Sequence, residues 1–233
     1  MREIVLDTET TGFEPDSGDR IVEIGAVELI GHMPTGRTYH QYINPERSMP
    51  EDAFKVHGLG DEFLADKPVF AQIVDEFLEF VGDATMVIHN ASFDMKFINA
   101  ELGWVGKPAL PMSQALDTLA IARRKFPGSP ASLDALCRRF GIDNSSRTLH
   151  GALLDSEILA DVYLELIGGR QPDFGLSAAA SSTTTSSAMS ADDWRPQPRP
   201  NPLSPRITAE EAAAHTAFVD KMGDGALWKK LSS

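Results

Sequence analysis

Two acidic residues, Asp7 and Glu9, stand at the end of an apolar run near the start of the chain. The run Ile4–Leu6 predicts a buried β-strand, and side chains two residues apart on a strand point to the same face of the sheet. The two carboxylates should therefore converge on one point. Carboxylates that lie so close repel each other, and burying either of them unpaired is costly. A bound cation is the usual reason for such a pair, so the sequence predicts a metal site here.

A third acidic residue, Asp94, lies where a predicted strand passes directly into a predicted helix, within residues 89–97. Asn90 or Ser92 would cap this helix. An acidic side chain in the first turn also interacts favourably with the helix dipole, which explains Asp94 without any ligand. From this stretch alone, a metal-binding role and a helix-stabilising role both stay open.

The fourth acidic residue, Asp155, lies near the start of another predicted helix, whose apolar residues recur every four positions from Leu154 to Leu166. His150 precedes Asp155 by five residues, so on a continuous helix it would point elsewhere. We place His150 in the loop before the helix, from which it can approach the same site. Taken singly, Asp155 could simply be a half-exposed acid and His150 a surface histidine, without any role in a site.

The four acids and the histidine together predict one kind of chemistry. Clustered carboxylates without cations would destabilise a fold, whereas around two divalent ions they form the oxygen-rich site that Mg²⁺ or Mn²⁺ prefers. Two such ions about 4 Å apart can hydrolyse a phosphodiester, because one activates a water and the other stabilises the leaving oxygen. A histidine that titrates near neutrality can take the proton of that water.

The elements that must position these residues alternate in a pattern typical of an α/β domain with a mixed sheet. Three strands close in sequence should form an antiparallel meander, at Glu3–Thr8, Ile21–Leu29 and Tyr39–Ile43. Helices and strands then alternate: a helix at Ala71–Val81, a strand at Thr85–Asn90, a helix from about Ser92, a short strand before Asp117, and helices at Asp117–Lys125, Ser132–Phe140 and Leu153–Ile167.

The composition is that of one ordinary domain with additional segments: 233 residues, of which 42% are hydrophobic. No apolar run approaches the length of about 18 residues that a membrane span requires, so we expect no membrane partner. The single cysteine, Cys137, excludes an internal disulfide and lies among apolar residues, so we expect it to be buried. A chain of this kind suits a reducing compartment, and we expect a cytoplasmic protein.

The formal net charge of −13 is unusual for a chain that would bind nucleic acid unaided. Bound metal ions could supply positive charge locally, and a partner protein could supply it globally. The charge therefore predicts either that the protein does not bind nucleic acid or that bound metal ions or a partner protein supply the positive charge for binding.

The composition changes near Gly168 and Gly169. Residues 177–202 are rich first in Ser, Thr and Ala and then in Pro, which predicts a flexible linker. Structure should return at Thr208, because residues 208–211 match a capping box and a helix-forming run follows as far as Gly223.

Four stretches carry a resemblance to a known family: VLDTETTG, VHGLGDEFL, HNASFDMKF and the run from Ser132 to Leu166. They resemble the histidine-containing (DEDDh) branch of the DEDD exonucleases, and closely its proofreading members, the epsilon subunits of bacterial DNA polymerase III. The resemblance spans nearly all of residues 1–170. It implies an RNase H-like fold for this domain and the removal of nucleotides from a DNA end in the 3′→5′ direction.

The same resemblance implies roles for individual residues. Asp7, Glu9, Asp94 and Asp155 would hold two Mg²⁺ or Mn²⁺ ions, Asp7, Glu9 and Asp155 would also contact the substrate, and His150 would be the general base. His57 matches a position near the terminal nucleotide, and Asp52 stands where the family often has Glu at a substrate contact. Without the resemblance, His57 would be a loop or helix-cap residue.

Partners are implied as well. The DNA substrate would be a primer 3′ end, residues 203–233 would bind the polymerase alpha subunit, and a theta-like small subunit is a further candidate. The peptide 171–176, with Gln171, Phe174 and Leu176, resembles those that bind the β sliding clamp. The alternatives are that both segments pack on the chain's own domain. The tail itself predicts an amphipathic helix with Ala214, Phe218 and Met222 four apart, followed by Leu227 and Trp228.

We therefore expect a proofreading exonuclease. Three other functions fit parts of the sequence: a DEDDh ribonuclease, a polymerase-tethered scaffold whose nuclease is dispensable, and a general Mg²⁺ phosphatase. The catalytic motifs do not separate the DNA and RNA nucleases, whereas the tail favours the polymerase subunit.

Overall fold

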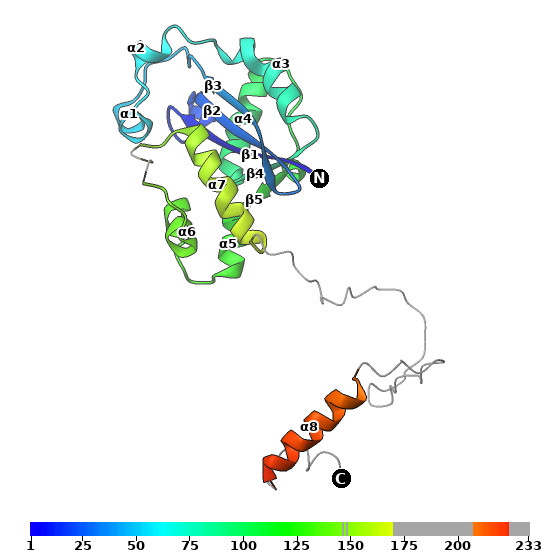
Figure 1. The fold of residues 1–233 in the computed structure, drawn as a ribbon. Coiled ribbons are helices and arrows are strands. Elements are labelled where there is room, and N and C mark those ends of the chain that lie inside the picture. Colours follow the sequence, from blue (N-terminus) through cyan, green and yellow to red (C-terminus); the bar gives the residue numbers. More distant parts are fainter. Residues whose placement is uncertain (146, 148, 170–206, 224–233) are drawn as a thin grey trace, which may run out of the picture. The chain divides into compact units, whose positions relative to one another are not determined.

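A computed structural model of the chain describes residues 1–145, 147, 149–169 and 207–223, which belong to two separate compact units (Figure 1). The first unit comprises the α/β domain, and the described residues of the second unit include the helix α8 (Ala209–Lys221). The peptide expected at 171–176, the linker at 177–202 and the anchors Leu227 and Trp228 lie outside the described residues. None of the helices within the described ranges has the length and hydropathy of a membrane span.

The first unit is built on a five-stranded mixed sheet with the strand order β3-β2-β1-β4-β5. The antiparallel part consists of β1 (Arg2–Thr10), β2 (Ile21–Ile30) and β3 (Met33–Tyr42). The parallel part adds β4 (Thr85–Ile88) beside β1 and then β5 (Ala115–Asp117). The predicted mixed sheet is therefore confirmed, and the carboxyl ends of β1, β4 and β5 lie at the same edge.

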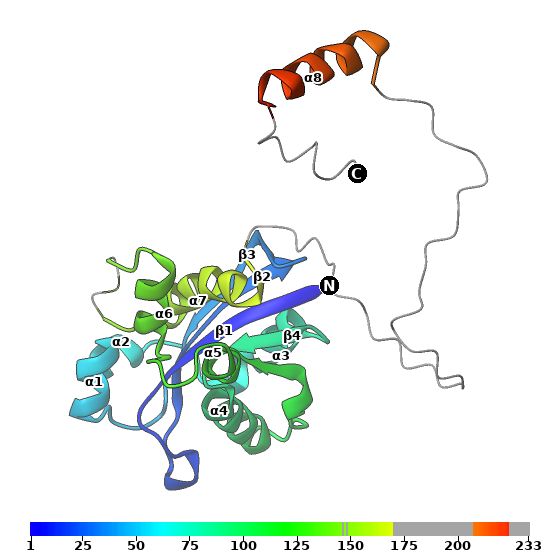
Figure 2. The same ribbon diagram turned by 90° about the horizontal axis from the view of Figure 1, so that it is seen from below.

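Helices cover both faces of this sheet (Figure 2). On one face, Ile4 and Leu6 of β1 pack in a core with α3 (Phe70–Val81) and α4 (Ala91–Trp104). On the other face, Val5 packs in a second core with α5 (Thr118–Lys125), α6 (Leu133–Phe140) and α7 (Ala152–Ile167). Cys137 is buried in this second core, as expected.

The structure differs from the sequence expectation between residues 33 and 64. β3 begins at Met33 rather than Tyr39, because an edge strand with hydrogen bonds on one side tolerates Pro34 and Gly36. Two short helices, α1 (Glu51–His57) and α2 (Asp61–Leu64), were not expected. Neither has a side-chain cap at its N-terminus, so the only start signals are the acids in their first turns, and both helices are shorter than a typical helix of about 8–20 residues. The remaining irregular turns include two 3₁₀ helices, η1 (Pro15–Ser17) and η2 (Met112–Gln114).

One glycine, Gly25 of β2, allows α7 to lie directly on the sheet. Gly25 pairs with Asp7 across the β1–β2 ladder, and a Cβ atom at Gly25 would lie 2.1 Å from the backbone nitrogen of Leu153. The hydroxyl of Ser156 donates a hydrogen bond of 2.9 Å to the Gly25 carbonyl. The first turn of α7 is thereby fixed opposite Asp7, which brings Asp155 beside it.

We expect Gly25→Ala to lower the free energy of unfolding by about 3 kcal/mol, because backbone atoms of α7 cannot yield to an added methyl group. Gly103→Ala is the matched control: it lies in α4, and nothing lies within 4 Å of an added Cβ. The control should gain about 0.7 kcal/mol, because alanine restricts the unfolded chain. Urea denaturation measures both, and equal stability of the two variants would contradict the close contact.

Candidate functional site

A pocket of about 470 Å³ opens at the carboxyl ends of β1, β4 and β5. All four acids singled out in the sequence line it, together with His150: Asp7, Glu9, Asp94 and Asp155. These residues come from segments as far apart as β1 and α7, so their convergence is a property of the fold rather than of any one motif.

Each acid reaches the pocket from a different part of the architecture. Asp7 and Glu9 lie on the face of β1 that α7 covers, and Asp155 lies in the first turn of α7. Asp94 lies in the first turn of α4, immediately after β4, and accepts a hydrogen bond of 2.7 Å from the Thr8 hydroxyl. The expected side-chain cap of α4 is absent: Asn90 stands at the N-cap in a left-handed conformation (φ 68°), and its side chain accepts no capping hydrogen bond.

Burial and, at Asp7 and Glu9, the charges of neighbouring pocket acids raise the pKa of three of the four acids. Burial, followed by the charges of Asp94, Glu9 and Asp155, raises the pKa of Asp7 well above its usual range. Burial and the neighbouring carboxylates raise the pKa of Glu9 to about 8. Burial raises the pKa of Asp94 to about 7, although the hydrogen bond from Thr8 opposes the shift. At neutral pH the metal-free pocket therefore retains protons that free carboxyl groups would have lost.

Asp155 behaves differently because a guanidinium group neutralises it. Burial would raise the pKa of Asp155, but His150 and Arg147 beside it outweigh that effect and hold the pKa below its usual value. Arg147 donates two hydrogen bonds to the Asp155 carboxylate, of 2.5 and 2.6 Å. It also donates to Asp134 of α6 at 2.9 Å and to Nδ1 of His150 at 2.8 Å. Arg147 thus connects α6, α7 and the His150 loop.

Arg147 was missed in the sequence analysis. One signal could have identified it: it is the only lysine or arginine between Arg139 and Arg170, and it stands three residues before His150. A lone cation next to a cluster of acids is a natural counter-charge.

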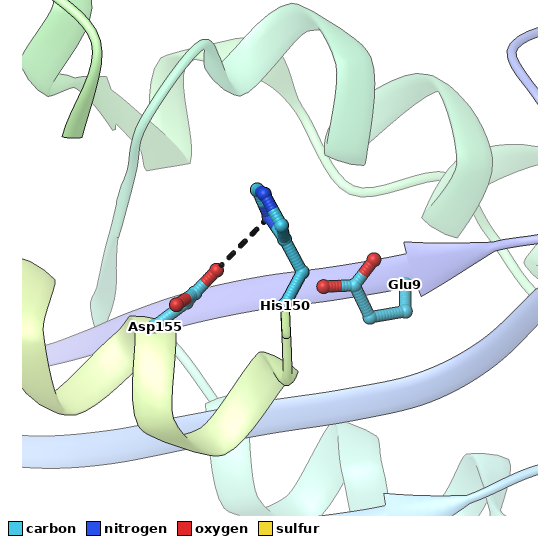
Figure 3. Close-up of side chains that lie close together, drawn as sticks. All are labelled: Glu9, His150 and Asp155. Carbon is cyan, nitrogen blue, oxygen red and sulfur yellow. Dashed lines mark ion pairs between the residues drawn. The ribbon is translucent and has the colours of Figure 1, made fainter. Parts of the chain in front are cut away.

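His150 lies in the loop before α7, as the helix geometry predicted, and its side chain is 49% exposed. Its backbone N–H donates to the carbonyl of Val56 at 3.1 Å, which ties this loop to α1. Figure 3 shows His150 with its ring near the Asp155 carboxylate, and Nδ1 lies 3.4 Å from Oδ2. Glu9 approaches from β1.

Glu9, His150 and Asp155 offer ligand atoms that all lie within 4.8 Å of one another, which is close enough for a single metal ion (Figure 3). Asp7 and Asp94 line the same pocket and add further oxygen donors. Hard divalent ions prefer such oxygen donors. Burial raises the pKa of Asp7, Glu9 and Asp94, and repulsion by neighbouring pocket acids adds to the shift at Asp7 and Glu9. A cation would favour the charged form of all three, so the residues fit divalent metal binding.

Two residues that the sequence placed near the substrate do not line the pocket. His57, the last residue of α1, is buried, and its Nδ1 accepts a hydrogen bond from the Leu59 backbone while Nε2 has no partner among the described residues. Asp52 is fully exposed on α1, 3.9 Å from Lys55.

Comparison with known proteins assigns residues 4–163 to the family described as Exonuclease. The DNA polymerase III subunit epsilon of Rickettsia prowazekii is 48% identical over 225 residues, which are 95% of this chain and 97% of that protein. The same subunit of Escherichia coli is 44% identical over 240 residues, covering 98% and 97%.

Solved structures share the fold. Exonuclease X in complex with 5′ overhanging duplex DNA is 26% identical, with a TM-score of 0.56 over 71% of this chain and 90% of that one. The nuclease domain of 3′hExo, a DEDDh family member bound to rAMP, is 19% identical, with a TM-score of 0.61 over 71% and 91%. The likeness to the second structure concerns the fold alone.

The raised pKa values predict how stability depends on pH. Above about pH 5 the unfolded chain releases protons that the folded, metal-free pocket retains up to about pH 7 to 8, so stability should fall as pH rises through this window. We expect a loss of about 3 kcal/mol between pH 5.5 and 8.0 in EDTA, and a smaller loss with Mg²⁺. Urea denaturation at both pH values measures the difference.

Asp7→Asn is the matched variant for this experiment, because it removes one carboxylate from the pocket at nearly constant volume. It should weaken both the pH dependence and the stabilisation by Mg²⁺. If the variant and the original chain lost stability equally with pH, and Mg²⁺ stabilised both equally, the pocket would not be the origin of the effect.

Proposed function

Since the chain belongs to the exonuclease family, among the epsilon subunits of DNA polymerase III, we propose that its acidic pocket is the centre that removes mispaired 3′-terminal nucleotides during replication. The fold is the RNase H-like fold of the DEDDh exonucleases, as the sequence predicted, and the protein is a 3′→5′ exonuclease of a metal-dependent family. The observation that carries the proposal is the convergence of four carboxylates and His150 on one pocket.

The four acids are the proposed metal ligands: Asp7, Glu9, Asp94 and Asp155. Mg²⁺ or Mn²⁺ fits them because every ligand is a carboxylate oxygen. Two such ions, when bound, would lower the pKa of a water and stabilise the leaving oxygen of the phosphodiester. Among the protein's own groups, the Thr8 hydroxyl orients Asp94 by donating a hydrogen bond to it. Asp155 would have to give up its hydrogen bonds from Arg147 in order to bind a metal ion.

His150 is the proposed general base. Nδ1 of His150 lies 2.8 Å from the guanidinium of Arg147, which can only donate hydrogen bonds, and 3.4 Å from Oδ2 of Asp155. These two contacts keep Nδ1 from approaching a water. Release of Arg147 from Asp155 would also release His150, which frees a ring nitrogen for that role. The exposed position of the ring allows this movement.

Contacts to the terminal nucleotide are proposed for Asp7, Glu9 and Asp155 in the pocket and for two residues of α1. The buried Nε2 of His57, unpartnered among the described residues, supports a ligand contact there, and α1 adjoins the His150 loop through Val56. The contact proposed for Asp52 rests on the family resemblance alone.

The protein acts on DNA and associates with DNA polymerase III, as its family does. More specifically, we propose that this association takes place in the cytoplasm and that residues 203–233 bind the alpha subunit. We also propose, from the sequence alone, that residues 171–176 bind the β sliding clamp and that a theta-like small subunit binds the chain. The predicted capping box forms at Thr208 and Glu211, and α8 exposes Phe218 (63%) and Met222 (49%). Tethering would hold a chain of net charge −13 beside the primer end at high effective concentration.

The test of function is digestion of end-labelled DNA with Mg²⁺ by the full chain, with paired and mispaired 3′ ends. We expect stepwise shortening from the 3′ end that is faster at mispairs, because unpaired ends fray and reach the pocket more often. Asp7→Asn should abolish hydrolysis by removing a metal ligand.

His150→Gln separates the base from the metal ligands in the same assay. It should slow hydrolysis by about 10²- to 10⁴-fold while Mn²⁺ binding, measured by calorimetry, changes little. Activity on short RNA but not on DNA would instead identify a ribonuclease, and full activity of Asp7→Asn would refute the proposed site.

Phe218→Asp should abolish co-elution of the full chain with the alpha subunit in size-exclusion chromatography, because it places a charge on the exposed apolar side of α8. Ala213→Asp is the control, since it adds the same charge about 140° away around the helix. Both variants should digest single-stranded DNA like the original chain. Co-elution of Phe218→Asp with alpha would contradict the proposed contact.

A further inference from the structure

Five exposed basic side chains gather on α5 and α6, which we call the α5–α6 basic surface: Arg123, Arg124, Lys125, Arg138 and Arg139. Residues 118–140 contain only one acidic side chain, Asp134, although the whole chain carries a net charge of −13. Positive charge is therefore concentrated on two helices of an otherwise acidic protein.

The basic side chains come from the last turns of both helices, which lie together. Phe126, at the end of α5, contacts Phe140, at the end of α6, with ring centroids 6.0 Å apart. The guanidinium of Arg139 lies over the ring of Phe126 at 4.2 Å. Figure 1 shows the two helices side by side.

Interactions within the protein do not account for this concentration of charge. Asp134 is occupied by Arg147, and none of the five basic side chains forms an ion pair with a residue that the structure describes. Cations do stabilise the C-terminal ends of helices, but by only about 0.3–1 kcal/mol near the last turn. Five cations at two neighbouring helix ends, none of them in an ion pair among the described residues, leave positive charge that an external anion can neutralise.

The surface begins at the rim of the acidic pocket. Arg123 lines the pocket, as do Leu133 and Asp134 from α6. Helix α1, which adjoins the His150 loop through Val56, and the following helix α2 carry four exposed acids and one exposed lysine, Lys55, which pairs with Glu51. The acids are Glu51, Asp52, Asp61 and Glu62. A polyanion whose end enters the pocket would therefore be attracted along α5 and α6 and repelled along α1 and α2.

We propose that the α5–α6 basic surface binds the sugar–phosphate backbone of the DNA strand whose 3′ end occupies the pocket. The proposal rests on the proposed function and adds the path of the substrate outside the site. Guanidinium groups match phosphate oxygens geometrically. Backbone contacts position a strand without reading its bases, which suits an enzyme that must accept any sequence.

The test compares two variants of the full chain that lose the same number of charges. Arg124→Gln with Arg138→Gln neutralises the basic surface but spares Arg123 in the pocket and Arg139 on Phe126. Arg37→Gln with Lys107→Gln is the control, because neither residue lines the pocket and each pairs with an acidic side chain elsewhere on the domain. Fluorescence anisotropy with a labelled single-stranded oligothymidylate in EDTA, between about 50 and 200 mM salt, gives the dissociation constants.

The surface variant should bind about tenfold more weakly than the original chain, and the magnitude of its slope of log K against log salt should fall by about 1.4, or 0.7 per lost phosphate contact. The control should change less than twofold. Equal binding and equal salt dependence of the two variants would overturn the proposal.

A second measurement separates this proposal from the proposed function. Hydrolysis of the p-nitrophenyl ester of thymidine 5′-monophosphate with Mg²⁺ reports on the pocket, and the two residues changed in the surface variant, Arg124 and Arg138, do not line that pocket. Absence of any hydrolysis by the original chain would count against the proposed function, while the binding comparison in EDTA would still decide the role of the surface. Slower ester hydrolysis by the surface variant alone would overturn the proposal, because the pocket itself would then be damaged.

Discussion

Repulsion among four carboxylates in one pocket is the constraint that the rest of the structure must satisfy. Burial makes the repulsion stronger, because a low dielectric screens charges poorly. The pKa values of Asp7, Glu9 and Asp94 are raised, and a guanidinium is bound to Asp155. Bound divalent cations would take the place of the protons on the carboxyl groups and of the guanidinium on Asp155. The metal-free protein thus holds its ligands near one another at a cost in stability that metal binding removes.

The architecture keeps the acids together in spite of this repulsion. The apolar interior of β1 fixes the strand between two cores, so Asp7 and Glu9 cannot turn away without exposing buried side chains. α7 is held against β2 by the close contact at Gly25 and the hydrogen bond from Ser156. Thr8 holds Asp94 from the other side of the strand. The fold therefore assembles the pocket without a metal ion, and metal binding is needed only to neutralise the charge of its carboxylates.

The sequence predicted the mixed sheet and its principal helices because apolar periodicity and start signals such as Ser132 are local. It also identified the four acids: Asp7 and Glu9 stand at the end of an apolar strand, and Asp94 and Asp155 were recognised by the family motifs around them. It could not reveal Arg147, whose partners lie on different elements and are set by tertiary packing. It likewise missed α1 and α2, which lack capping side chains, and it gave no sign that the basic ends of α5 and α6 would lie together.

The most direct test of the central claim is an anomalous difference map from crystals of the chain soaked with Mn²⁺. The account predicts two peaks about 4 Å apart in the pocket, within coordination distance of Asp7 and Asp155, with Arg147 no longer bonded to Asp155. An empty pocket at saturating Mn²⁺, with the contact between Arg147 and Asp155 intact, would contradict the claim that cations balance these carboxylates.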